Sequence, residues 1–467
     1  MDSNRNDREG ELEIPSSQIK SRSINTETNL TAVNDAKTHT LARMLRLQRC
    51  FEENMNVLYD FCSLYVSEWP LLTLEWIPAL TISDPSCDYT LKYLAVGMQA
   101  SKGKPNQVQL MEVALPSVQN TDDGGYSISS AGMRPATDPG NQFQHVRGHC
   151  CFQHVITVDS PVLKIRAGSI NTHLVAVKAG SGFIGVYNLA QDENMCGREH
   201  ALLKIVLRGH RSGGFGLAWN PVRAGIIASG GDDCYVNYWD IRHAIDCTTV
   251  DCEARELSVL PDATGSDAWP IGRFVGHRDV VTDVSWHASE DHLLVSSSLD
   301  GDVRFWDTRF NARPTTLIEA HKGGATAAQF HPTGVFQLVT AGVRGEVSFW
   351  DTRWPKEPFM TIHYHNQCVT GLQWSPFSKT ILGSFSESGQ VVIWDLDKSH
   401  LPPGYSENDM APPEVAFVHI GHLGPVTDLS WCPEERDAWI MASADALNGI
   451  HVYRPKLSIL RDYIVTL

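Results

Sequence analysis

The chain has 467 residues, 20% of them charged, and a formal net charge of −16 at pH 7. Such an acidic balance disfavours the basic surface that most nucleic-acid-binding proteins carry, and it suits a basic partner or simple solubility. We find no apolar run of roughly eighteen residues and no apolar leader, so we expect neither a membrane span nor a secretory signal. The 11 cysteines form no paired framework, which fits a reducing compartment.

The first part of the chain divides into a tail and a helix. Residues 1–34 are polar and poor in large apolar side chains, so we expect a disordered tail. In residues 35–56 apolar side chains recur at steps of three and four, which predicts an amphipathic N-terminal helix. The polar side of this helix is basic, since it carries Arg43, Arg46 and Arg49.

Four repeats follow, in each of which a histidine precedes a Trp-Asp pair by 29 residues. These pairs are His210 and Trp239, His277 and Trp306, His321 and Trp350, and His365 and Trp394. A repeat of roughly 40 to 45 residues with Gly-His near its start and Trp-Asp near its end is typical of a blade of four short strands. We therefore predict an all-β fold, a seven-bladed WD-repeat β-propeller, in residues 57–467.

The seven blades can be placed along the chain. The third to sixth are expected to end at the four tryptophans, and the second lacks both markers. Both chain ends would take part in ring closure, with a strand from the other terminus closing the first blade. The remaining blades are expected at residues 72–79 with 92–115 (first), 154–190 (second) and 421–454 (seventh).

A recurring polar set explains the histidines. A hydroxyl stands ten residues before each tryptophan, at Ser229, Ser296, Thr340 and Ser384. Asp233 and Asp300 stand six residues before the first two. We predict that each histidine bonds this aspartate and the hydroxyl, and that the hydroxyl also reaches the indole N–H. Arg344 and Ser388 occupy the aspartate position in the other two repeats, so an incomplete network is expected there.

This repetition favours a structural role over a hydrolase triad, because no oxyanion-forming turn accompanies the histidines. The chain also has no Cys-x-x-Cys or His-Glu-x-x-His arrangement. We therefore expect no catalytic residue, no metal and no cofactor.

Three insertions interrupt the repeats, and loops on a rigid scaffold commonly carry specificity. They are expected at 116–150, 243–270 and 398–418. The second is acidic, and its simplest interpretation is a solvated loop. The third holds two prolines that keep it extended, together with several acids. These residues are Glu407, Asp409, Pro412, Pro413 and Glu414.

Several stretches in combination go beyond a generic propeller. The chain from about residue 35 to 455 resembles the retinoblastoma-binding WD-repeat histone chaperones, whose relatives form the small subunit of chromatin assembly factor. The helix before the first blade and the diproline insertion in the sixth carry the resemblance in particular. The matching stretches include Leu58-Tyr59-Asp60, residues 68–73, 214–221, 280–287, 373–376 and 411–414.

This resemblance implies a non-enzymatic histone-binding scaffold of chromatin assembly, deacetylase, remodelling or Polycomb-type complexes, in the nucleus and also in the cytoplasm. It implies that a helix of histone H4 docks between the N-terminal helix and the diproline insertion. Glu407, Asp409 and Glu414 would pair with histone Arg and Lys beside Pro412 and Pro413. The apolar contacts would come from Leu41, Met44, Leu45 and Phe51. The family's docking helix is acidic, however, and the basic helix of this chain would repel a basic histone segment.

The resemblance also implies a peptide site on the top face of the ring, where family members hold the histone H3 tail with acidic or amide side chains. This acidic lining is largely gone, and Trp69 and Phe215 remain as aromatic contacts. A less basic or more apolar peptide would suit this face. The changed positions are Pro161, Leu163, Gly213, Thr282, Gly324, Thr326 and Cys368.

An alternative function comes from Arg242, Arg309 and Arg353, each of which stands two residues after a Trp-Asp pair. Propellers that serve as substrate receptors of cullin-RING ubiquitin ligases carry this motif and use the arginine to bind an adaptor. The simpler interpretation is that each arginine packs beside its own ring. Co-purification with a ligase adaptor, or with histones and other chromatin proteins, separates the two functions.

Overall fold

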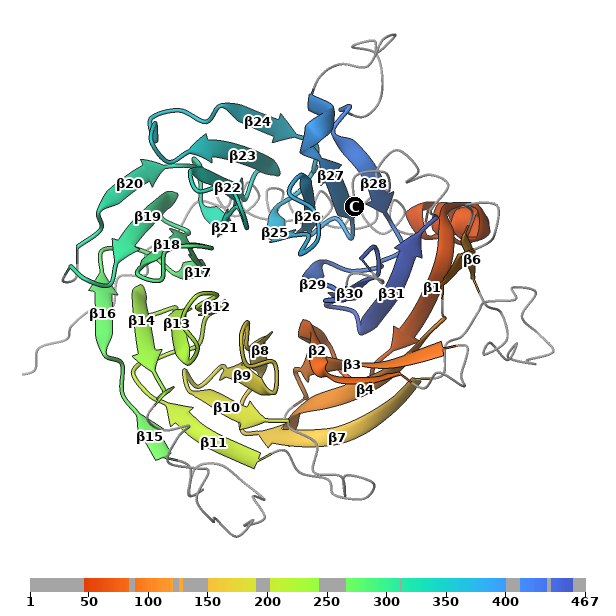
Figure 1. Cartoon of the computed structure of the whole chain (residues 1–467), viewed down its shortest axis with the longest axis horizontal. Coiled ribbons are helices and arrows are strands. Elements are labelled where there is room, and N and C mark those ends of the chain that lie inside the picture. Colours follow the sequence, from red (N-terminus) through yellow and green to blue (C-terminus); the bar gives the residue numbers. More distant parts are fainter. Residues whose placement is uncertain are drawn as a thin grey trace, which may run out of the picture.

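The computed structural model places seven β-sheets in a closed ring around a common axis, with one helix at the rim (Figure 1). The predicted seven-bladed propeller is confirmed. No helix in the described part of the chain is long and apolar enough to cross a membrane. The described residues are 46–83, 89–101, 103–116, 118–120, 126–128, 150–189, 202–242, 266–310, 313–399, 412–434 and 438–456.

Each blade is an antiparallel sheet whose first strand faces the axis and whose last strand lies at the rim (Figure 1). Blade 1 consists of β2 (Leu71–Ser83), β3 (Tyr89–Met98), β4 (Asn106–Pro116) and β7 (Cys150–Val158). Blade 2 consists of β8 (Val162–Ala167), β9 (Leu174–Ala179), β10 (Ile184–Asn188) and β11 (Leu202–Leu207), with β15 (Ser266–Ala268) added in parallel to β11. Blade 3 consists of β12 (Gly216–Trp219), β13 (Ile226–Gly230), β14 (Tyr235–Asp240) and β16 (Gly272–Val275).

The next three blades repeat this arrangement. Blade 4 consists of β17 (Val281–Trp286), β18 (Leu293–Ser298), β19 (Asp302–Asp307) and β20 (Thr316–Glu319). Blade 5 consists of β21 (Ala325–Phe330), β22 (Gln337–Gly342), β23 (Glu346–Asp351) and β24 (Met360–His363). Blade 6 consists of β25 (Val369–Trp374), β26 (Ile381–Ser386), β27 (Val391–Asp395) and β28 (Val415–His419), with the 3-10 helix η2 (Leu396–Ser399) after β27.

Ring closure occurs in blade 7, where the N-terminal strand β1 (Tyr59–Val66) joins β29 (Val426–Trp431), β30 (Met441–Asp445) and β31 (Gly449–Pro455). β1 pairs antiparallel with β31 as the outermost strand. N-terminal and C-terminal strands therefore meet in one sheet, as predicted. The prediction that a C-terminal strand closes the first blade was wrong, because the N-terminal strand β1 closes the last blade instead. The expected second blade was also placed too early, since residues 154–158 belong to blade 1.

The Trp-Asp pairs lie near the end of the third strand of their blades, so the blade ends predicted at the tryptophans were wrong by one strand. In blade 3, for example, Trp239 is on β14, and the outer strand β16 follows the insertion. The Gly-His segment of the next repeat comes directly after that outer strand. The segment from Gly-His to Trp-Asp therefore forms the three inner strands of one blade, and the outer strand lies between one Trp-Asp pair and the next Gly-His pair.

The insertions contain little described structure. A short hairpin of β5 (Val118–Asn120) and β6 (Tyr126–Ile128) lies in the first, and β15 lies in the second. In the third, the outer strand β28 already begins at Val415, so the insertion is shorter than expected. Residues 1–34 and most of the three insertions lie outside the described residues.

The predicted polar network is complete in blade 4. Nε2 of His277 lies 2.7 Å from Oγ of Ser296, and the Trp306 indole donates to the same oxygen at 2.8 Å. Nδ1 of His277 lies 3.1 Å from a carboxylate oxygen of Asp300. All of these groups are buried or nearly so, and each finds a partner.

Blade 5 corrects one expectation, because Glu346 completes the network that Arg344 was expected to leave open. Its carboxylate lies 3.1 Å from Nδ1 of His321, whose Nε2 lies 2.8 Å from the Thr340 hydroxyl. In blade 6 the network is incomplete as predicted: Nε2 of His365 bonds Ser384, while its buried Nδ1 has no hydrogen-bond partner among the described residues.

Blade 3 differs from the expected pattern because a lysine of blade 2 enters its network. Nζ of Lys178 lies 2.7 Å from Oγ of Ser229, so His210 bonds the backbone oxygen of Ser229 at 3.1 Å instead. The Trp239 indole donates to the backbone oxygen of Arg208. Burial lowers the pKa of the Lys178 amine to about 7.

Candidate functional site

The N-terminal helix is described from residue 46 to 58 and leads directly into β1 at the rim of blade 7 (Figure 1). Its inner side is apolar: Phe51 and Met55 are buried in one core cluster with Phe417 of β28 and Tyr453 of β31. Phe51 is only 2% exposed. The expectation that it contacts a histone needs correction, because its ring is already packed inside the protein.

The outer side of the helix offers a different set of groups. Arg49, Glu53 and Val57 are exposed, and 60% of the Val57 surface is accessible. The exposed side therefore mixes both charges with an apolar residue, rather than being uniformly basic. Three of the residues expected to bind a histone, Leu41, Met44 and Leu45, lie outside the described residues.

A buried aromatic and histidine cluster anchors this helix to the ring. The Tyr59 hydroxyl lies 2.7 Å from Nδ1 of His419, and Nε2 of His419 lies 2.9 Å from Nδ1 of His451. The Phe51 ring meets His419 edge to face at 5.3 Å and stacks on His451 at 6.0 Å. Burial lowers the pKa of both His419 and His451 well below the ordinary histidine value. The cluster thereby joins the helix, β1, β28 and β31.

His419, His422 and His451 place their nitrogen atoms within 4.8 Å of one another, close enough to consider a metal. The rings do not converge, however, because His422 and His451 stack with planes 9° apart and centroids 3.9 Å apart. The lone pairs of stacked rings run parallel, so they cannot meet at one ion. Both nitrogens of His422 are also bonded, to Asp445 at 2.8 Å and to Ser443 at 2.6 Å. The arrangement is that of a hydrogen-bond network.

The diproline segment leads into β28, which packs against the same core as the helix. Pro412, Pro413 and Glu414 are all half-buried, and the backbone oxygen of Glu414 accepts a hydrogen bond from the Asp395 N–H at 2.7 Å. Three residues after Glu414, the Phe417 ring meets Tyr59 at 5.3 Å. Glu407 and Asp409 lie outside the described residues.

The two aromatic residues expected on the top face lie in connections between blades. Trp69 is half-buried between β1 and β2, and the Lys104 ammonium lies 4.8 Å from the centre of its ring. Phe215 precedes β12 and is 46% exposed. Other apolar side chains are exposed in the connections on this face, namely Leu299, Leu423 and Leu447.

Acidic groups missed by sequence reasoning lie on the innermost strands, below the top face. Asp428 of β29 lies 2.9 Å from Nζ of Lys164 and 3.2 Å from Nη1 of Arg166, both on β8. Arg166 also lies 3.4 Å from Glu75 of β2, and the Thr73 hydroxyl donates to Asp428 at 2.7 Å. We call these five residues the axial charge cluster. It joins blades 7, 1 and 2 at the point where the ring closes.

The pKa values of both carboxyl groups in the axial charge cluster are shifted. Burial opposes ionisation of Asp428, but Arg166 and Lys164 outweigh it and hold the Asp428 pKa at about 2. Burial raises the pKa of Glu75 to about 7 despite the neighbouring Arg166. Asp283 on β17 is similarly affected, since burial raises its pKa to about 6. Because Asp428 is paired with Lys164 and Arg166, its role is structural.

The three arginines of the ubiquitin-ligase alternative are each paired with the aspartate of their own Trp-Asp pair. Nη2 of Arg309 lies 2.7 Å from Asp307, and Nη2 of Arg353 lies 2.6 Å from Asp351. Arg242 makes the same bidentate pair with Asp240. The guanidinium charges are therefore neutralised within the chain.

Comparisons with known proteins agree with this architecture. A family model described as histone-binding protein RBBP4, or a component of the CAF1 complex, matches residues 48–117, which cover the helix, β1 and most of blade 1. A second model, described as "MIOS, WD40 repeat", matches residues 151–416. Neither match points to a ligase receptor.

A relative from Schizosaccharomyces pombe, "Histone acetyltransferase type B subunit 2", is 36% identical over 420 residues, which cover 89% of this chain and 91% of the relative. Identity at this level therefore spans most of the ring. The chain therefore belongs to the WD-repeat family of histone-binding proteins that includes RBBP4.

Proposed function

We propose that this chain is a non-enzymatic, histone-binding scaffold within a chromatin complex in the nucleus. The observation that carries the proposal is the match of residues 48–117 to a family model described as histone-binding, since this segment contains the rim helix. The name of the S. pombe relative supports a place in a histone-modifying assembly. The ring offers a rigid support on which loops and a helix can hold peptides.

The first binding surface in this proposal is the side groove between the rim helix and the diproline segment. A histone H4 helix would lie there in the manner of a helix in a groove. Exposed Glu53 and half-buried Glu414 supply negative charge, Val57 supplies apolar surface, and exposed Arg49 opposes a basic ligand. Leu41, Met44, Leu45, Glu407 and Asp409 remain proposed contacts.

The second surface is the top face, where we propose an apolar or weakly basic peptide. Phe215 is 46% exposed, Leu447 60% and Leu299 39%, all in connections on this face. Trp69 is partly covered and already has the Lys104 ammonium near its ring. An apolar peptide would bury these side chains.

Calorimetry with the full chain tests both surfaces. We expect a histone H4 helix peptide to bind, and Pro412→Gly with Pro413→Gly to weaken binding about tenfold by loosening the groove wall. We expect a histone H3 tail peptide to bind weakly. Phe359→Ala serves as the control, because Phe359 is also an exposed aromatic residue, with 62% of its surface accessible. Absence of histone binding would refute the function, and tight H3 binding abolished by Phe215→Ala would refute the altered top face.

A further inference from the structure

Blade 2 lacks every side chain of the polar network that is complete in blade 4. Its strand β8 begins four residues after Val158, as β17 begins four residues after His277. This alignment runs without a gap to the third strand, where Tyr187 stands at the tryptophan position. Val158 therefore replaces the histidine, Val177 the hydroxyl and Ser181 the turn acid.

A cavity of about 40 Å³ lies where the network would be. The space exists because the replacing side chains are smaller than a histidine and a tryptophan. Its walls are mostly apolar because two of the polar residues are replaced by valines. Gly185 also lines the cavity and makes room for the Tyr187 ring, since a Cβ atom there would lie 2.6 Å from that ring. The apolar wall consists of Val158, Val177, Ala179, Phe183, Tyr187 and Val206.

The size of the cavity restricts what can enter it. One water molecule requires about 10–15 Å³ of cavity volume. The cavity of about 40 Å³ therefore accepts about three heavy atoms. Cofactors and drug-sized molecules occupy pockets of about 300–1,000 Å³. One aliphatic side chain, such as that of valine or leucine, fits these limits, and the rest of its chain would lie across the mouth.

The mouth of the cavity is acidic. Two carboxylates, Asp159 and Asp267, face one guanidinium, that of Arg208. Nε of Arg208 lies 2.7 Å from Asp267, and its guanidinium lies 4.9 Å from the centre of the Phe183 ring. Asp159 is exposed and makes no hydrogen bond or ion pair with the described residues, so one negative charge remains for a ligand.

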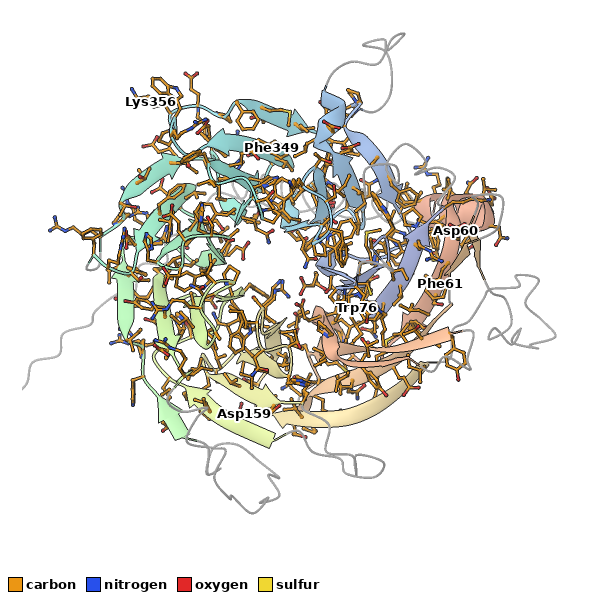
Figure 2. All side chains as sticks on the ribbon, viewed as in Figure 1. Asp60, Phe61, Trp76, Asp159, Phe349 and Lys356 are labelled. Carbon is orange, nitrogen blue, oxygen red and sulfur yellow. The ribbon has the colours of Figure 1, made fainter. Side chains whose placement is uncertain are left out.

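We propose that this cavity in blade 2 binds an extended peptide that inserts one Val or Leu side chain and places an adjacent Lys or Arg against Asp159. Desolvating the aliphatic group provides affinity, and the charge pair selects the neighbouring residue. The site is distinct from the side groove, as Figure 2 shows Asp159 well apart from Asp60, which marks the start of β1 beside the helix. Trp269, two residues beyond Asp267, is 67% exposed and extends the surface available to the peptide.

Photo-crosslinking of the full chain tests this site at the weak affinity that one side chain provides. The probes are two capped tetrapeptides in which photo-leucine is followed by either lysine or glutamate, and labelled residues are mapped by mass spectrometry. We expect the lysine probe to label residues 158–187 about fivefold more than the glutamate probe. Asp159→Lys should reverse this preference, whereas Asp279→Lys, an exposed change on blade 4, should leave it intact.

A second variant removes the cavity without changing the charge at its mouth. Ala179→Leu fills the space from its wall and should abolish labelling by both probes, with Phe359→Ala as the unaffected control. Circular dichroism reports whether Ala179→Leu folds, and Asp159→Lys remains decisive if it does not because Asp159 is exposed. Equal labelling by both probes, or labelling confined to other segments, would overturn the proposal.

Discussion

The Tyr59 hydroxyl lies 2.7 Å from Nδ1 of His419, although the two residues are 360 positions apart in the sequence. This bond joins the first strand of the chain to the outer strand of blade 6. It lies in a fully buried cluster, where an unpaired polar group costs far more than it does in water.

Removing that hydroxyl should destabilise the ring. In Tyr59→Phe the ring packing is retained, but Nδ1 of His419 loses its partner in the protein interior. We expect the free energy of unfolding to fall by about 1–3 kcal/mol in a denaturant titration. Tyr364→Phe is the matched control, because that ring contacts Trp394 at 5.7 Å while its hydroxyl makes no hydrogen bond with the described residues. Equal losses in the two variants would contradict this reasoning.

The incomplete network of blade 6 can be completed. Ser388→Asp places a carboxylate at the position from which Asp300 reaches His277, where buried Nδ1 of His365 lacks a partner among the described residues. We expect a gain of about 1 kcal/mol in unfolding free energy. The pKa of His365, which burial lowers to about 4, should rise in an NMR titration. Arg344→Asp should bring no such gain, because Glu346 already bonds the histidine of blade 5.

Acidification should weaken the closing blade through its histidines. Burial lowers the pKa of His419 and His451 in the folded protein, so the unfolded chain binds more protons below its ordinary histidine pKa of about 6.5. Their contribution is present above this pH and is lost as the pH falls, by up to about 1.4 kcal/mol per pH unit for each histidine. Denaturant titrations at several pH values between about 5.5 and 8 measure it. In the Glu75→Gln variant, which lacks the opposing carboxyl group, a profile that stays flat or rises toward the acidic end would refute this role.

Glu75 should act in the opposite direction. Burial raises its folded-state pKa to about 7 from an ordinary value of 4.5. Its stabilising contribution is therefore complete below pH 4.5 and is lost as the pH rises through 7. We expect Glu75→Gln to be more stable than the natural chain at about pH 8, by about 1–3 kcal/mol, and equally stable near about pH 4. Exposed Glu53→Gln should match the natural chain throughout, and the same result for Glu75→Gln would disprove the shift.

Charge on the rim helix should control histone H4 binding. Arg49 is exposed beside the proposed side groove, so Arg49→Glu exchanges a repulsion for an attraction. Calorimetry with the H4 helix peptide should show affinity rising about three- to tenfold. Lys356→Glu is the control, since Figure 2 shows Lys356 on another part of the rim, well away from the helix. Weaker binding by Arg49→Glu would place the ligand elsewhere.

The repeat spacing was sufficient to predict the ring and the network of His277, because both depend on residues close together in one repeat. Glu346 escaped prediction because it stands two residues beyond the expected turn position and still reaches His321. The axial charge cluster could not be foreseen either. Glu75 and Asp428 are brought together only when the ring closes, and no local pattern records that pairing.

Strand β1 also went unrecognised, because it follows the helix with no turn between them and its partner, β31, stands at the other end of the sequence. The binding surfaces were located only in outline. Phe51 fits the three- and four-residue spacing of apolar side chains in the helix. This spacing alone does not tell which of those side chains pack against the ring and which remain free to bind a ligand. Blade 2 was recognised as lacking its markers, whereas the hollow left behind depends on how its neighbours pack.

Because β1 pairs only with β31 in the described sheets, this first described strand has no sheet to join until residues 449–455 have been synthesised. A nonsense mutation before residue 449 would do more than delete a strand. It would leave the edge of β1 open to pairing with other chains and take away the surface on which the rim helix rests. During synthesis the exposed edge of β1 would therefore need protection, for example by a chaperone, until β31 has been made.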